Sequence, residues 1–108
     1  MPVPVPRKTP SDCPIERCIG VLSGRWKAMV IWRLRTGPQR FSELFHDIPH
    51  VQERVLSQVL RGLSDDGLIE KSEGGAWSLT PEGRRLDPVL AAMFEWSAGA
   101  PAGEFAKA

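Results

Sequence analysis

Two cysteines and two histidines are the residues of this sequence whose types could do covalent or metal chemistry. Cys13 directly precedes Pro14, and because proline is favoured at the first position of a helix, we expect Cys13 to be the N-cap. Its sulfur would then face unpaired backbone N–H groups and the positive end of the helix dipole, an arrangement that makes thiolate available. Two interpretations of Cys13 stay open: a sensor of oxidants or electrophiles, or a small residue that fills a cap position.

The remaining members of this set do not indicate metal binding or catalysis. Cys18 lies on the apolar stripe of the first predicted helix, so we expect it to pack in the core. His46 and His50 have H-x₃-H spacing, but Pro49 breaks any helix between them, and the cysteines lie much further away than in a zinc finger. There is no glycine-rich phosphate loop, no nucleophile motif and no base near Cys13. The sequence therefore predicts no metal site, no cofactor and no enzymatic activity.

A different chemistry, recognition of bases and phosphates, is indicated between residues 51 and 63. This stretch predicts a helix with apolar residues on one side and polar residues on the other. Arginine can donate two hydrogen bonds to guanine, glutamine can pair with adenine, and serine can contact a base or a phosphate. Basic groups outside the helix would bind phosphates and fix the register. The candidate DNA-contacting residues are Lys27, Arg40, Ser42, Gln52, Arg54, Ser57, Gln58, Arg61 and Lys71.

Composition is compatible with one ordinary domain that binds DNA. The chain has 108 residues, 42% of them hydrophobic and 25% charged. The net charge of +1 conceals an uneven distribution, because basic residues outnumber acidic ones by seven to three between residues 25 and 62. No apolar run approaches the roughly 20 residues of a membrane span, and the N-terminal segment does not resemble a secretory signal. We therefore expect a cytoplasmic protein, without membrane contact, whose cysteines are thiols.

The elements that position these residues can be predicted from apolar spacing and from glycine and proline. Apolar residues at helical spacing predict four helices, over 14–22, over 26–35, in a short stretch around 41–48, and over 51–66. Ser42 is the expected N-cap of the third helix. Gly67 and Leu68 should end the fourth helix in a Schellman motif.

A β-hairpin and further helices are predicted after the fourth helix. The expected strands cover residues 68–72 and 76–79, and Glu73-Gly74-Gly75 makes the turn. Because this turn is short and acidic, we expect it to add little to DNA binding beyond Lys71. Thr80 and Pro81 then begin a helical stretch that Pro88 divides in two. This order of elements predicts a mainly α fold with a small β-hairpin, a winged helix-turn-helix.

The stretch from Leu86 to Trp96 carries more apolar residues than one small domain can bury, which supports a homodimer. A two-fold dimer would place two copies of the fourth helix in successive major grooves, about 34 Å apart. The expected domain covers residues 12–98, between a flexible arm, 1–11, and a disordered tail, 99–108. The candidate interface residues are Ile15, Ile19, Val89, Leu90, Met93 and Phe94.

Several stretches of the sequence are similar to the HxlR family of bacterial winged-helix regulators, relatives of the MarR group. The similarity covers about residues 13–97 and rests on the order of its motifs. They are CPIER at 13–17, GRWK at 24–27, GPQRFSEL at 37–44, VLSQVLR at 55–61, DGLI at 66–69 and WSLTPEG at 77–83. Family members usually have a longer hairpin than this chain.

The resemblance implies a homodimer, built from the terminal helices, that binds two-fold symmetric operators through the helix within residues 51–63. In several members a cysteine placed like Cys13 responds to electrophiles or oxidants. We therefore expect a sequence-specific DNA-binding transcriptional regulator, a repressor, whose effector is a small electrophile or oxidant. The alternative is a winged-helix protein–protein interaction module that lacks sequence-specific DNA binding.

Overall fold

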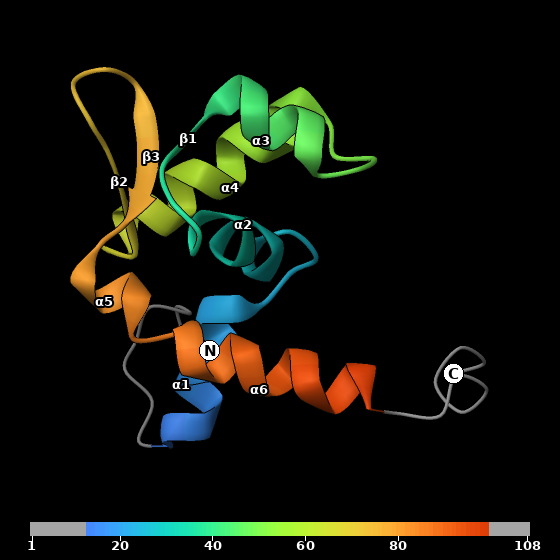
Figure 1. Ribbon diagram of the computed structural model, residues 1–108. Coiled ribbons are helices and arrows are strands. Elements are labelled where there is room, and N and C mark those ends of the chain that lie inside the picture. Colours follow the sequence, from blue (N-terminus) through green and yellow to red (C-terminus); the bar gives the residue numbers. More distant parts are fainter. Residues whose placement is uncertain (1–12, 100–108) are drawn as a thin grey trace, which may run out of the picture.

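The computed structural model describes residues 13–99, which are mainly helical with a small antiparallel sheet (Figure 1). The predicted fold class is confirmed. The predicted arm, 1–11, and the predicted tail beyond its first residue lie outside the described residues. The helices are α1 (Pro14–Leu22), α2 (Lys27–Leu34), α3 (Phe41–Asp47), α4 (Glu53–Asp65), α5 (Pro81–Arg84) and α6 (Asp87–Ala98). The strands are β1 (Gln39–Arg40), β2 (Ile69–Lys71) and β3 (Ala76–Leu79).

The hydrophobic core is built around α2 and α4 and is closed by the sheet. In α4 the predicted stripe is confirmed: Leu56, Leu60 and Leu63 are buried, and Val55 and Val59 are partly buried beside them. Burial of each such leucine contributes roughly 1.5–3 kcal/mol to stability, so this stripe orients the helix. The buried core residues are Val30, Ile31, Leu34, Leu44, Ile48, Val51, Leu56, Leu60, Leu63, Leu68, Ile69, Leu79 and Leu90.

The sheet contains a strand that the sequence did not predict. β2 and β3 form the expected hairpin, and β1 adds to the other edge of β3, which gives the order β1-β3-β2. In β1, Gln39 pairs with Trp77 and Arg40 pairs with Ala76. A strand of two residues is too short to show the alternation by which strands are recognised. Its pairing brings the start of α3 beside the hairpin.

Helix ends follow local chemistry, with one correction. The predicted Schellman motif is confirmed, because the Leu68 N–H donates to the Leu63 carbonyl at 3.0 Å and Gly67 has φ 78°. Ser42, however, is not the N-cap of α3. That position is held by Arg40, whose backbone N–H donates to Glu43 Oε1 at 2.8 Å. The glutamate three residues into the helix thus supplies the contact of a capping box without a serine or threonine at the cap.

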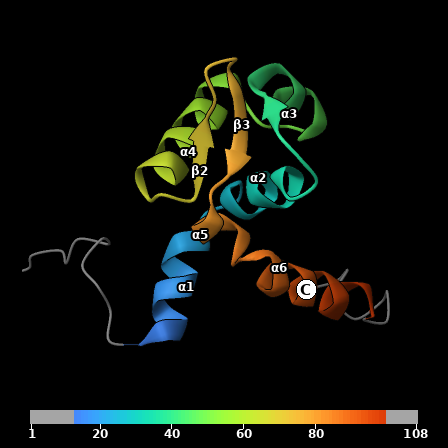
Figure 2. The same ribbon diagram turned by 60° about the vertical axis from the view of Figure 1, so that its left-hand side comes forward.

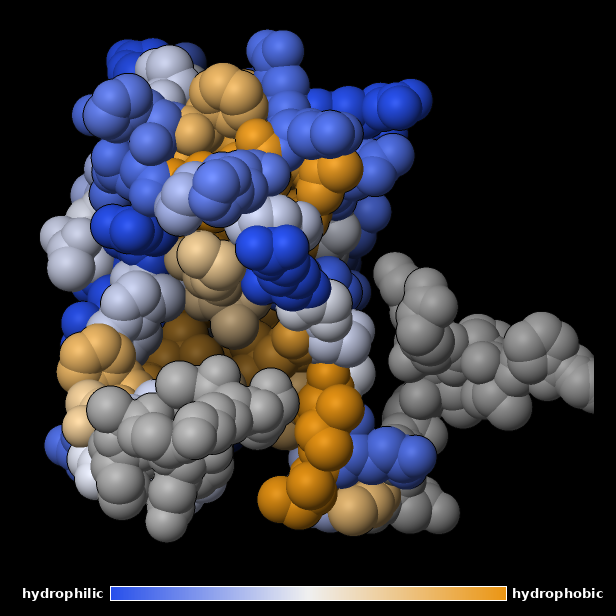
Figure 3. Space-filling model, turned by 90° about the vertical axis from the view of Figure 1, so that its right-hand side faces the viewer, coloured by the Kyte–Doolittle hydropathy of each residue, from blue (hydrophilic) through white to orange (hydrophobic). Residues whose placement is uncertain are grey.

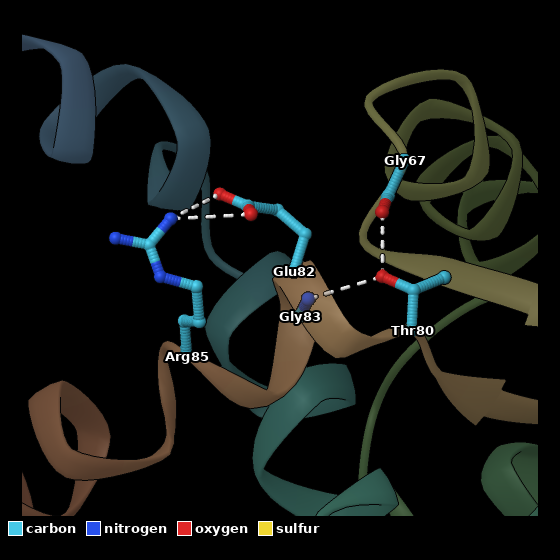
Figure 4. Close-up of polar contacts among 5 residues, drawn as sticks. All are labelled: Gly67, Thr80, Glu82, Gly83 and Arg85. Carbon is cyan, nitrogen blue, oxygen red and sulfur yellow. Dashed lines mark hydrogen bonds and ion pairs between the residues drawn. The ribbon is translucent and has the colours of Figure 1, made fainter.

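Thr80 joins the end of α4 to the start of α5, as Figure 4 shows. Its hydroxyl donates to the Gly67 carbonyl at 2.6 Å and accepts from the Gly83 N–H at 3.0 Å. The predicted cap with Pro81 behind it is therefore confirmed. On the other side of the same short helix, Glu82 and Arg85 form an exposed ion pair at 3.0 Å (Figure 4).

The two terminal helices lie at the same end of the structure. In Figures 1 and 2, α1 and α6 extend from the end opposite the hairpin turn and α3. The helix-turn-helix, α3 and α4, and the hairpin therefore form one end of the structure, and the two terminal helices form the other.

Candidate nucleic-acid interface

The exposed side of α4 presents the side chains that could read bases. Arg54, Ser57, Gln58 and Arg61 are all exposed, while the opposite side of the helix lies in the core. Their spacing of three and four residues places them on one face. The predicted one-sided burial of this helix is therefore confirmed.

A shallow groove of ≈ 450 Å³ separates α4 from the hairpin. It brings together three predicted DNA-contacting residues, Ser57 and Arg61 from α4 and Lys71 from β2. Asp65 adds a carboxylate at its edge, so the lining is mixed in charge rather than uniformly basic. The lining residues are Phe41, Ser57, Leu60, Arg61, Ser64, Asp65, Lys71, Gly75 and Trp77.

Arg40 belongs to the hairpin end of this surface, although it lies far from the hairpin in sequence. A Cβ placed on Gly75 would lie 3.1 Å from its Nη1, and one on Gly74 would lie 3.8 Å from its Nη2. The guanidinium group therefore rests against the turn. Gly75 also has φ 94°, which favours glycine on conformational grounds. The turn thus has a cation beside it that its own sequence, Glu73-Gly74-Gly75, does not supply.

Lys71 is held by an aromatic side chain that the sequence analysis did not single out. Its Nζ lies 5.5 Å from the centroid of the Trp77 ring, and the two residues are paired across β2 and β3. A lysine over a tryptophan ring gains about 0.5–1 kcal/mol at an exposed site. The cross-strand register could have revealed this pair, since the two residues lie symmetrically about the predicted turn.

The other predicted DNA-contacting residues lie outside the groove. Ser42 is exposed and lines a separate hollow with Gln39 and Glu43. Gln52 is exposed at the N-cap of α4, and Lys27, the first residue of α2, is half-buried.

The cysteines and histidines are placed as follows. Cys13 is exposed at the N-cap of α1, where it was predicted, and its carbonyl accepts from the Arg17 N–H at 3.1 Å. Cys18 is half-buried and packs less completely than predicted. His46 and His50 are exposed, and His50 lies in the turn between α3 and α4 with φ 69°. Among residues 13–99, no three histidine, cysteine, aspartate or glutamate side chains are grouped as metal ligands would be.

The terminal helices expose a hydrophobic surface, which we call the α1–α6 face and define by Ile15, Ile19, Val89, Met93 and Phe94. Exposed fractions reach 69% for Ile15 and 57% for Phe94. In Figure 3 hydrophobic side chains gather in the lower part of the face shown, around a recess. Such a surface commonly marks an interaction site.

Leu90 corrects the predicted interface. It is only 4% exposed and belongs to the chain's own core, so it is not available to a partner. Phe94 serves two surfaces, because one side of its ring stacks on Trp32 while the residue remains largely exposed.

The family model described as HxlR-like helix-turn-helix matches residues 21–100. The chain belongs to this family. It is 34% identical over 92 residues to the HTH-type transcriptional regulator YvaP of Bacillus subtilis, which covers 79% of this chain and 85% of that protein. This relative and one from Methanothermobacter thermautotrophicus are both named HTH-type transcriptional regulators, and with the family match they confirm the predicted family.

Two solved structures of similar regulators share the fold. The redox regulator HypR in its oxidized form has a TM-score of 0.75 and 30% identity, over 82% of this chain and 98% of that one. The quinone-bound YodB of Bacillus subtilis has a TM-score of 0.74 and 29% identity, over 82% of this chain and all of that one. None of the helices in residues 13–99 combines the length and apolar character that a membrane span requires.

Proposed function

We propose that this HxlR-like chain is a repressor that binds a two-fold symmetric DNA operator as a homodimer. The observation that carries the proposal is the exposed polar face of α4, flanked by a groove that Lys71 and Arg61 line together. A helix buried on one side and lined with arginine, glutamine and serine on the other is the form that enters a major groove.

Base recognition is assigned to the α4 face. Arg54 and Arg61 can each donate a bidentate pair of hydrogen bonds to guanine, and Gln58 can pair with adenine. Glu53, the first residue of α4, favours the positive end of the helix dipole but repels phosphate, so contacts should concentrate further along the helix. Each bidentate pair is worth about 1–3 kcal/mol of discrimination against a wrong base.

Phosphate binding is assigned to basic side chains around that face. Lys71 lies over Trp77 at the groove, and Arg40 lies at the hairpin turn. Both would bind the backbone beside the major groove that α4 occupies. Lys27 is a further phosphate contact in this proposal, at the start of α2. These contacts fix the register and contribute the salt-dependent part of the affinity.

The proposed occupant of the α1–α6 face is a second copy of the chain. The twelve-residue helix α6 leaves both Met93 and Phe94 exposed, and water contacts such apolar side chains unfavourably. An identical surface on a second copy is apolar in the same places, and a two-fold arrangement closes the contact. It would also give the two α4 helices the symmetry of a palindromic site.

Cys13 is the proposed sensor of a small electrophile or oxidant. It is exposed, and it caps α1, the helix that carries Ile15 and Ile19 of the α1–α6 face. Modification of its sulfur at this helix end would shift α1 against the partner copy and change the separation of the α4 helices. The redox regulator HypR and the quinone-bound YodB, both similar in fold, support this choice of effector class.

The experiment that tests this function is selection of bound sequences from random duplex DNA, with and without diamide. We expect a two-fold symmetric consensus that diamide removes. Arg54→Ala should weaken binding to the consensus by about thirtyfold or more and binding to random DNA far less, because the proposed dimer loses one base contact in each half-site. Arg84→Ala, at an exposed position of α5, is the control and should change neither.

Two outcomes would contradict the proposal. Equal losses on consensus and random DNA for Arg54→Ala would remove base recognition from α4. Affinity no better than micromolar, without a recovered consensus, would favour the protein–protein interaction module instead.

A further inference from the structure

A cluster of four side chains attaches α6 to the rest of the structure, and we call it the α2–α6 joint: Trp32, Arg35, Asp87 and Phe94. The Trp32 and Phe94 rings stack with centroids 5.3 Å apart and planes at 11°. The Arg35 guanidinium lies 4.3 Å from the Trp32 centroid on α2. Its Nε donates to Asp87 Oδ1, at the first residue of α6, at 2.9 Å. Both the start and the middle of α6 are therefore tied to the C-terminal half of α2.

The α2–α6 joint restricts the direction of α6 more than it contributes to the stability of the fold. The Arg35 and Asp87 side chains are 31% and 45% exposed, and ion pairs at such positions contribute little. The planar guanidinium, however, contacts an aromatic ring and a carboxylate at once, which restricts its geometry. Two contacts one to two helical turns apart define the angle of α6, whereas a single contact would leave it able to pivot.

The joint is connected to α4, the proposed base-reading helix, through α2. α2 buries Val30, Ile31 and Leu34 in the core beside Leu56 and Leu60 of α4. Beyond the joint, the only α6 residue in the core of the described chain is Leu90. The orientation of α6 relative to α4 therefore depends mainly on the contacts that α2 makes with α6 at the joint.

We propose that Trp32, Arg35 and Asp87 are positioning residues that set the separation of the two operator half-sites. The inference rests on the proposed dimer and its DNA binding. A helix of twelve residues is about 18 Å long, so a tilt of about 10° at the joint displaces its far end by about 3 Å. That distance is close to one base-pair step along DNA. A small change at the joint is thus large enough to alter half-site spacing by about one base pair.

The test measures affinity for the selected operator and for versions with one base pair inserted or deleted between the half-sites. Wild-type protein should lose about tenfold or more on the altered spacings. In Trp32→Leu, which removes the stack, and Asp87→Asn, which removes the ion pair, the penalty should fall severalfold. A stacked aromatic pair corresponds to about two- to tenfold in an equilibrium constant. Affinity for an isolated half-site and the dimer dissociation constant should stay within about twofold.

Two controls separate positioning from general damage to the fold. Trp32→Phe keeps an aromatic ring on Phe94 and should retain the spacing preference. Glu82→Gln removes the local ion pair with Arg85, the C-cap of α5, and should behave as wild type.

Three results of this test would overturn the inference. An undiminished spacing penalty in both Trp32→Leu and Asp87→Asn would overturn the inference. A uniform loss that includes the isolated half-site would also overturn it, because the joint would then only stabilise the fold. If wild-type protein itself forms no dimer or selects no operator, the proposed function fails first, and the inference fails with it.

Discussion

Gly83 in α5 offers the sharpest single perturbation, because its substitution by alanine meets backbone rather than a movable side chain. A Cβ there would lie 2.1 Å from the Leu68 carbonyl oxygen and 3.3 Å from Leu79 Cδ2. Comfortable carbon–oxygen contacts are about 3.3–3.6 Å, so α5 must move away from the hairpin by more than about 1 Å. The substitution therefore separates two elements that the fold holds in direct contact.

The cost of Gly83→Ala can be worked from the contacts that such a movement opens. Overpacking a tight site costs about 1–3 kcal/mol. The hydrogen bonds from the Thr80 N–H to Leu68 and from its hydroxyl to Gly67 are each worth about 0.5–1.5 kcal/mol and would stretch. We expect the free energy of unfolding to fall by about 2–4 kcal/mol. With about 4–8 °C per kcal/mol for a domain of this size, Tm should drop by about 8–32 °C.

The assays are urea unfolding and thermal unfolding, both followed by circular dichroism, with all variants at one protein concentration because the proposed dimerisation would add to apparent stability. Gly62→Ala is the matched control, since Gly62 lies in α4 with nothing within 4 Å of its added Cβ. There the change should stabilise by up to about 1 kcal/mol, because alanine favours helix. If Gly83→Ala were as stable as wild type, the contact between α5 and Leu68 would not be as close as described.

Three further predictions address the proposed DNA-binding surface, the proposed dimer surface and the proposed sensor. Arg40→Ala should lower the slope of log affinity against log salt by about 1.8, because the proposed dimer loses two phosphate contacts of about 0.9 each; an unchanged slope would remove this arginine from phosphate binding. Gly75→Ala should lower the slope by less, because the added Cβ moves the end of the Arg40 side chain by only a few tenths of an ångström. Ile19→Glu should shift the protein toward monomer in sedimentation experiments and weaken operator binding, because a carboxylate is costly to bury; a dimer of wild-type strength would place the partner elsewhere. Cys13→Ser should bind the operator normally and ignore diamide, whereas a retained response would assign sensing to another group.

The parts of the fold that sequence predicts well are those set by local chemistry. α4 was predicted because Leu56, Leu60 and Leu63 recur at helical spacing, and its end was predicted because Gly67 permits a positive φ. Thr80 was predicted as a cap for the same local reason. The candidate DNA-reading face followed directly, since the exposed side of an amphipathic helix is determined once the buried side is known.

The features that the sequence did not reveal depend on contacts between distant segments. β1 forms because Gln39 and Arg40 pair with β3. A strand of two residues has no sequence pattern from which this pairing could be predicted. Arg40 also replaced Ser42 as a cap because Glu43 lies three residues further on. Leu90 was assigned to a partner because α6 is apolar on more than one side. Only packing against α2 decides which of those sides faces inward.

The arginine that rests against the hairpin turn has a consequence for how this protein family can vary. Because Arg40 comes from a separate strand, the loop between β2 and β3 can lose residues while a positive charge stays at its tip. The loop must keep a small residue at Gly75, because a Cβ there would lie 3.1 Å from Arg40 Nη1. The length of the β2–β3 loop and the positive charge beside it are therefore independent of each other. A shorter loop can keep the phosphate contact that we propose for Arg40.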